Sequence, residues 1–124
     1  MNDIVIPGDN PILSPVVDLA IHSGTMKSRL ISFVDFMGEN PWWKPDFAGY
    51  VEHLRQRGNA ETTISSHLST VRERYRQLVL DRDLLYSIVD RHGYRGLAMR
   101  KLLVDEIEKR ILNECDRKIK LDIT

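Results

Sequence analysis

The stretch NAETTISSHLSTVRERYRQLVL, residues 59–80, decides the predicted fold because its apolar residues recur with helical spacing. These residues, at i, i+4, i+7, i+11, i+14 and i+15, are Ile64, Leu68, Val71, Tyr75, Leu78 and Val79. Such spacing places them on one face of a continuous α-helix. Gly58 ends the element before it, and Asn59 is the expected N-cap of this helix.

The polar face of this predicted helix carries small hydroxyl residues where a solvated helix usually carries Glu and Lys. They are Thr62, Ser65, Ser66 and Ser69, and Arg72, Arg74 and Arg76 follow downstream. Short hydroxyl side chains at the positively polarised N-terminus would let a backbone phosphate approach closely, and the later arginines could reach further phosphates. The alternative is a core helix whose serines merely face water.

Length and composition indicate one globular domain. The chain has 124 residues, of which 42% are hydrophobic and 29% charged. Its one cysteine, Cys115, excludes an internal disulfide framework and suits a reducing compartment. The first residues, MNDIVIPGDN, lack the pattern of a signal peptide, and no stretch is apolar for the length of a membrane span. We therefore expect a soluble, cytoplasmic protein with no membrane partner.

The net charge is zero, but the charges are unevenly distributed. Residues 1–26 hold three acids and no base, and residues 102–124 hold six acids and five bases, which leaves thirteen bases and nine acids in the middle. This modest positive excess permits a phosphate-facing surface. It predicts weak binding by this domain alone, because affinity grows with the number of phosphates neutralised.

The remaining segments complete a predicted helical bundle. Residues 1–14 form a turn-rich, flexible arm, and residues 15–21 suit one or two helical turns. A helix then begins at Thr25, capped by Ser23 or by Thr25 itself. Its apolar positions are Met26, Leu30, Phe33, Val34 and Met37.

Two further helices follow in the sequence. Asp46 caps the first, which Gly58 ends, and at least one of the preceding residues Trp42 and Trp43 is expected to plug the core. Residues 81–83 make a turn before a short helix over residues 84–89. Four helices with short loops and no alternating strand pattern predict an all-α bundle over residues 15–91.

The C-terminal part is predicted to be a basic linker and one more helix. Residues 92–101, which include HGYRG, have the glycines of a linker, and residues 102–124 begin with a helical apolar stripe. The stripe contains Leu103, Ile107 and Ile111, while KIKLDIT at the end suggests a frayed terminus. This helix packs on the bundle, pairs with a second copy, or belongs to a domain that is not here.

Three runs of sequence carry a family resemblance: TMKSRLISFVDFM, PDFAGYVEHLRQRGNAETTISSHLSTVRERYRQLV and LYSIVDRHGYRGLAMRKLLVDEIEKRIL. Together they resemble the N-terminal core-binding, SAM-like domain of the tyrosine recombinases, the phage-integrase family. The resemblance covers residues 16–112, and its specificity lies in the order and spacing of helical patterns. It implies a four- to five-helix orthogonal bundle with a C-terminal helix that starts a catalytic domain.

The resemblance also implies a DNA-binding surface. Two helices of the family bundle approach the major groove, which by position gives Lys27 and Arg29 on the first helix here and Thr62, Ser66, Ser69 and Arg72 on the second. Arg91, Arg95, Arg100 and Lys101 resemble the connection that crosses the DNA backbone. Family members often carry a basic residue or glutamine where Thr62 and Ser66 stand, so the shorter side chains favour contact with the DNA backbone over base readout.

No catalytic role is expected for this chain. The family's reaction needs a tyrosine nucleophile and arginines that stabilise the phosphate, and these would lie in a separate domain. Tyr50 and Tyr75 fall on core stripes, and none of the tyrosines has the family's arginine pattern around it. The four histidines and Cys115 lack metal-ligand spacing, so we expect scattered surface histidines, no metal, no cofactor and no small-molecule substrate.

Two functions thus follow from the sequence. The first is the DNA-binding module of a tyrosine recombinase, which would position further protomers of the same recombinase on double-stranded DNA. The second is a helical protein-interaction adaptor with no nucleic-acid role, which would use Trp42, Trp43 or the last apolar stripe. Zero net charge favours the adaptor, whereas hydroxyl and basic residues on two separate helices favour DNA binding.

Overall fold

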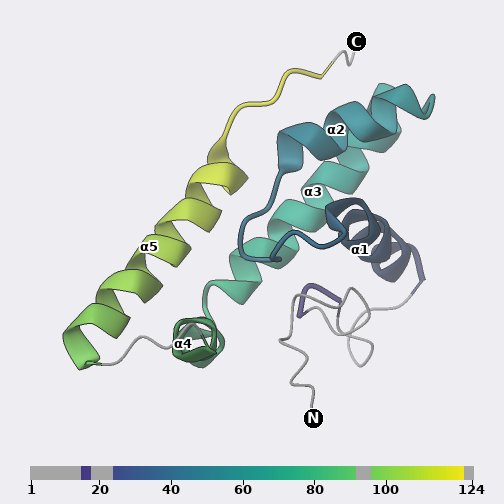
Figure 1. Cartoon of the computed structure of the whole chain (residues 1–124). Helices are drawn as coiled ribbons and strands as arrows, with labels where there is room; N and C mark the ends of the chain where they lie inside the picture. The colour runs from purple at the N-terminus through teal and green to yellow at the C-terminus, as the bar shows by residue number, and fades with distance from the viewer. Residues whose placement is uncertain (1–14, 18–23, 92–95, 122–124) are drawn as a thin grey trace.

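The computed structural model describes residues 15–17, 24–91 and 96–121, and these residues form five α-helices and no β-strand. The helices are α1 (Gly24–Met37), α2 (Phe47–Gln56), α3 (Glu61–Leu78), α4 (Arg82–Arg91) and α5 (Leu97–Asp116). In Figure 1, α4 is seen almost end-on while α3 and α5 run across the view, so the helices cross steeply. The all-α prediction is confirmed.

Helix α3 is central to the bundle, because α1, α2 and α5 all pack against it. The predicted face is buried, with Ile64, Leu68, Val71, Tyr75 and Leu78 each at most 5% exposed. Aromatic rings from α1 and α2 pack on this face. The ring of Phe33 meets those of Tyr50 and Tyr75 edge-on, with centroids 5.0 and 5.8 Å apart, which is a favoured aromatic geometry.

Helix α5 packs on the bundle, which is the first of the three possibilities that its apolar stripe left open. It runs beside α3 in the opposite direction and also contacts α4 (Figure 1). Val104, Ile111 and Cys115 point into the shared core and are at most 1% exposed. The helix begins at Leu97, so residues 97–101 are helical although the sequence suggested a linker there.

Features near the starts of α1, α2 and α4 follow the predictions only in part. Asp46 caps α2 as predicted, because its Oδ1 accepts a hydrogen bond from the Gly49 N–H at 2.9 Å. The predicted turn at residues 81–83 is shorter, since α4 begins at Arg82 and Asp81 Oδ1 accepts from the Leu84 N–H at 3.1 Å. Met26, predicted as a core residue of α1, is 47% exposed.

The prediction that Asn59 caps α3 is wrong. The N-cap of α3 is Ala60, which has no side-chain capping bond. Asn59 instead donates from Nδ2 and from its backbone N–H to the carbonyl of Leu54, at 3.0 and 3.2 Å. Gly58, at φ +84°, supplies the left-handed turn between the helices. Asn59 thus satisfies a carbonyl at the end of α2 rather than an N–H at the start of α3.

Residues 118–121 do not form the frayed end that the sequence suggested. Arg117 has extended backbone angles, and beyond it Lys118 and Lys120 are exposed while Ile119 and Leu121 are half-buried against the core. This alternation is that of an extended chain with one face on the protein. Arg55 of α2 holds the segment by donating from Nη2 to the Lys120 carbonyl at 3.3 Å.

The remaining expectations concern Trp42, the N-terminal residues and the absence of a membrane span. Trp42 is buried, 3% exposed, as expected for a core plug. The predicted arm over residues 1–14, most of the predicted turns over residues 15–21, and Ser23 lie outside the described residues. No described helix is both long enough and apolar enough to span a membrane.

Candidate nucleic-acid interface

The two helices predicted to face DNA pack against each other, and Arg29 joins them. From α1, Arg29 Nη1 donates to Thr70 Oγ1 of α3 at 3.0 Å. Thr70 Oγ1 in turn donates to the Ser66 carbonyl at 3.0 Å, and Ser66 Oγ donates to the Thr62 carbonyl at 3.1 Å. The cation of α1 therefore lies against the row of hydroxyl residues on α3.

These hydrogen bonds change the role expected of the hydroxyls. A serine or threonine hydroxyl has one proton, and Ser66 and Thr70 give theirs to carbonyls one turn back in their own helix. These hydroxyl oxygens therefore present only lone pairs to the outside. A phosphate oxygen is itself a hydrogen-bond acceptor and cannot bond to them. Donation to a phosphate by Ser66 would require its hydroxyl to rotate, whereas the guanidinium of Arg29 has further N–H groups to offer.

The other predicted residues on these helices lie on different flanks. Thr62 and Ser69 are exposed on the outer face of α3, near the half-buried Ser66. Lys27 is half-buried and stands two positions before Arg29, so the two side chains leave α1 in different directions. The structure links Arg29 through Thr70 to Ser66 and Thr62. Ser69 and Lys27 do not take part in these bonds.

The three arginines of α3 bind the chain's own backbone. Arg74 donates to the carbonyls of Val16 and Pro15, at 2.9 and 2.6 Å. On the opposite flank of α3, Arg72 donates to the Arg117 carbonyl and Arg76 to the Cys115 carbonyl at 3.2 Å. Carbonyls at a helix C-terminus lack intrahelical partners, and cations are favoured there. These arginines thus hold the end of α5 and residues 15 and 16 on α3.

Arg72 is partly enclosed by its surroundings. Its Nε is buried and has no hydrogen-bond partner among the described residues, and its guanidinium lies 6.0 Å from the centre of the Phe47 ring. Burial lowers the pKa of the Arg72 guanidinium from its ordinary value.

Of the predicted linker bases, Arg100 is paired within the protein. It lies in the first turns of α5, with Nε 2.8 Å from Asp90 Oδ1 and Nη2 3.0 Å from Asp90 Oδ2. Its guanidinium also lies 5.4 Å from the centre of the Tyr86 ring. Arg95 lies outside the described residues, whereas Arg91 and Lys101 are exposed. The charge of Arg100 is thus largely matched by Asp90.

A polar cluster inside the bundle was missed by the sequence analysis. Tyr50 Oη donates to Ser32 Oγ at 2.9 Å and lies 3.0 Å from His67 Nδ1, so α1, α2 and α3 meet there. His53 is close by, its ring 5.1 Å from that of Phe36. His53 and His67 thus lie around one tyrosine, whereas His22 and His92 lie outside the described residues. The sequence indicates that a buried tyrosine needs a hydrogen-bond partner, but it does not indicate which residue is that partner.

The part of the chain that the structure describes holds no cluster of metal-ligand side chains. No group of three His, Cys, Asp or Glu side chains there could hold a metal ion. Tyr75 is fully buried, its Oη donates to the Trp42 carbonyl at 2.6 Å, and burial raises the pKa of its hydroxyl well above the ordinary value. Tyr50 and Tyr75 are core residues, as predicted.

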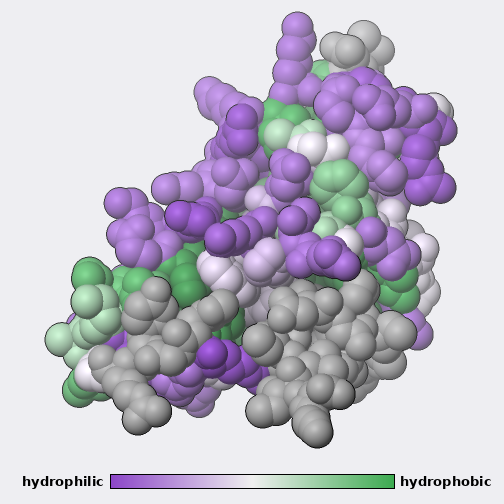
Figure 2. All heavy atoms as spheres, viewed as in Figure 1, coloured by the Kyte–Doolittle hydropathy of each residue, from purple (hydrophilic) through white to green (hydrophobic). Residues whose placement is uncertain are grey.

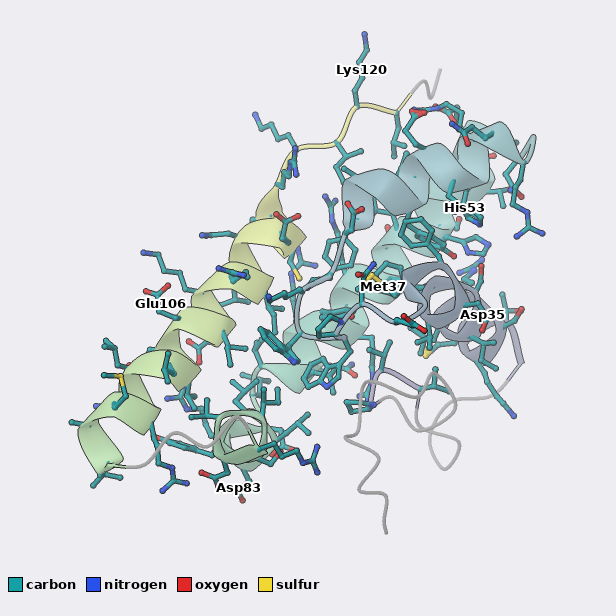
Figure 3. The ribbon with its side chains drawn as sticks, in the orientation of Figure 1. Asp35, Met37, His53, Asp83, Glu106 and Lys120 are labelled. Carbon is teal, nitrogen blue, oxygen red and sulfur yellow. The ribbon has the colours of Figure 1, made fainter. Side chains whose placement is uncertain are left out.

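A separate apolar cavity of about 260 Å³ lies between α4, α5 and the loop that carries Trp43. Its apolar walls are Trp43, Ile88, Val89, Leu103 and Ile107, and its charged residues are Lys44, Glu106 and Arg110. Figure 2 shows hydrophobic surface at the lower left, over the first part of α5, where Leu97, Met99 and Leu102 are exposed. Figure 3 shows Glu106 pointing outward from this helix.

No protein-family model matches the chain, no curated protein matches it, and no solved structure matches it. Function must therefore be inferred from the residues and their geometry.

Proposed function

We propose that this chain is the DNA-binding, core-binding module of a tyrosine recombinase, with the SAM-like fold of that domain. It would position protomers on double-stranded DNA, while the strand-cleaving tyrosine would belong to a separate domain. The order and spacing of the helical patterns suggested this function, and five helices in that order are compatible with it. Cytoplasmic location is part of the same proposal.

The observation that carries the proposal is the contact between Arg29 and Thr70. It brings a cation from α1 to the hydroxyl row of α3, at 3.0 Å. Two helices then share one surface where a half-buried basic residue adjoins short side chains, a combination that lets a DNA backbone come close. No carboxylate is paired with Arg29 among the described residues, so its charge remains to attract phosphate.

The test is fluorescence anisotropy with a labelled duplex of random sequence, at low salt and again near physiological salt. Saturable binding that weakens steeply with salt is expected, because counterions are released from the phosphates. Arg29→Glu should weaken binding by roughly tenfold, since one phosphate contact is lost and a repulsion is added. The matched control is Lys109→Glu, which makes the same charge change at an exposed position of α5.

Two results would reject this proposal. One is a folded protein that binds no duplex at low salt; the other is equal weakening by Arg29→Glu and Lys109→Glu, which would indicate an effect of net charge alone. If binding is seen, selection from randomised duplexes should return inverted repeats, because protomers of this family act on paired half-sites.

The cavity beside Trp43 favours the adaptor as a second candidate function. Its apolar walls and its rim of Lys44, Glu106 and Arg110 would suit one or two apolar side chains of a partner helix. Such binding would be nearly insensitive to salt. Trp43→Ala should abolish binding of the partner helix and leave duplex binding unchanged. Arg29→Glu should weaken duplex binding and leave binding of the partner helix unchanged.

A further inference from the structure

A groove with strong positive charge lies between α3 and the segment after α5. Five cationic side chains and one carboxylate line it: Arg72, Arg76, Arg117, Lys118, Lys120 and Asp116. We call it the basic groove. The groove could not be recognised from the sequence, because its cations come from two segments about forty residues apart and because the whole chain has zero net charge. The fold thus brings positive charges together in one groove, although the charges of the whole chain sum to zero.

The carboxylates near the groove do not cancel this charge. Arg76 Nη2 lies 3.4 Å from Asp116 Oδ1, and Arg117 Nη1 lies 3.8 Å from Glu114 Oε2, both in exposed, loose geometry. Against the five cations, these two carboxylates leave a net of three positive charges. The C-terminus of α5 adds about half a negative charge. A net positive charge of about two to three therefore remains.

Lys118 and Lys120 are the free cations of the groove. Their ammonium groups make no ion pair or hydrogen bond among the described residues, and both side chains are exposed. Figure 3 shows Lys120 pointing away from the bundle. Their backbone is held in place from both sides, because Ile119 packs inward and Arg55 bonds the Lys120 carbonyl. Two cations are thus presented on a positioned segment, which lowers the entropy cost of binding an anion.

The basic groove adjoins the hydroxyl row of α3. Ser69, Arg72 and Arg76 stand at i, i+3 and i+7 of the helix, so they follow one another along one flank. A duplex lying on Thr62, Ser66 and Ser69 would continue toward the groove. The groove lies on the flank of α3 opposite to that which Arg29 occupies, because Arg72 bonds Arg117 whereas Thr70 bonds Arg29.

We infer that the basic groove binds the phosphodiester backbone of double-stranded DNA, with Lys118 and Lys120 as its direct phosphate contacts. This inference rests on the proposed function. Arg72 and Arg76 hold the end of α5 and Arg117 in place by donating hydrogen bonds to backbone carbonyls. They keep these contacts when DNA binds and add to the positive electrostatic potential of the groove. The module then holds DNA along two strips, one at Arg29 and one at the groove.

The experiment compares a double variant of the groove, Lys118→Gln with Lys120→Gln, with a matched pair on α5, Lys109→Gln with Arg110→Gln. Each removes two positive charges from exposed side chains. Anisotropy with a fluorescein-labelled random duplex is measured between about 0.05 and 0.2 M salt. Two lost phosphate contacts should raise Kd roughly tenfold or more and lower the slope of log K against log salt by about 1.8. The control pair should change the slope little.

The outcomes separate this inference from the proposed function. If the groove variant binds like the wild type or like the control pair, while Arg29→Glu loses affinity, the groove assignment is overturned and DNA binding by the module stands. If the wild-type chain binds no duplex at low salt, both are overturned. Far-ultraviolet circular dichroism and a melting curve check that the groove variant folds, which its solvent-facing substitutions should allow.

Discussion

Tyr75 donates its hydroxyl proton to the backbone carbonyl of Trp42, 2.6 Å away, and both side chains are buried. The bond ties the C-terminal end of α3 to the loop between α1 and α2. It also explains the position of Trp42, whose ring centre lies 6.2 Å from that of Tyr75. A core helix thereby fixes a loop that has no regular structure of its own.

Tyr75→Phe should destabilise the protein by about 1–3 kcal/mol, because the carbonyl of Trp42 would stay buried without its donor. Urea denaturation followed by circular dichroism measures this change. Tyr86→Phe is the control, since Tyr86 is half-buried and its hydroxyl makes no hydrogen bond within the described residues. Equal stability of the two variants would mean that the Tyr75 bond contributes nothing measurable.

Asn59→Asp should lower the free energy of unfolding by roughly 1 kcal/mol. Aspartate is as good an N-cap as asparagine, so a residue that capped α3 would tolerate the change. A carboxylate cannot donate to the Leu54 carbonyl, however, and its charge would face that oxygen. Urea denaturation at neutral pH measures the free energy of unfolding. A variant as stable as the wild type would favour the capping role that the sequence suggested.

Gly49→Ala should have different effects in two backgrounds. An added Cβ at residue 49 would lie 2.2 Å from Asp46 Oδ2, so the cap of α2 would have to move. Capping is worth about 1 kcal/mol, and replacing glycine in a helix gains up to about 1 kcal/mol. The substitution should be neutral or harmful in the wild type but stabilising in Asp46→Ala. A double-mutant cycle by urea denaturation measures the coupling, and equal effects in both backgrounds would contradict this steric account.

His67 should titrate below the ordinary histidine value of 6.5, because burial and the nearby Arg29 lower its pKa. Its neutral form is then favoured by folding. As the pH falls below 6.5, the unfolded state takes up a proton that the folded state resists, so stability declines on acidification. Nuclear magnetic resonance titration of the imidazole checks the direction. Arg29→Gln should move the pKa upward, and Lys109→Gln should leave it unchanged.

The helices were predictable from the sequence because their causes are local. Spacing alone identified the buried face of α3, and the short polar side chain of Asp46 before an apolar run identified the start of α2. Asn59 misled the prediction because a side chain that can accept a hydrogen bond can also donate one. Which bond forms depends on whether the end of α2 or the start of α3 lies within reach.

The candidate site was less predictable, because its residues come from different helices. Arg29 and Ser66 were expected on DNA-facing helices, and the structure brings those helices together. That Arg72 would turn toward Arg117, and that Tyr50 would join Ser32 to His67, could not be read from either segment alone. Both contacts need the packing of α3 against its neighbours.

The sequence by itself determined the helical class, the buried stripe of α3 and the cap of α2, since hydrophobic periodicity and capping act within a few residues along the chain. Only the tertiary structure decided that α5 packs on the bundle and that Arg72 faces Lys118 and Lys120 across one groove. The reason is physical: charge and hydrogen-bond partners act through space, and zero net charge describes a sum rather than an arrangement.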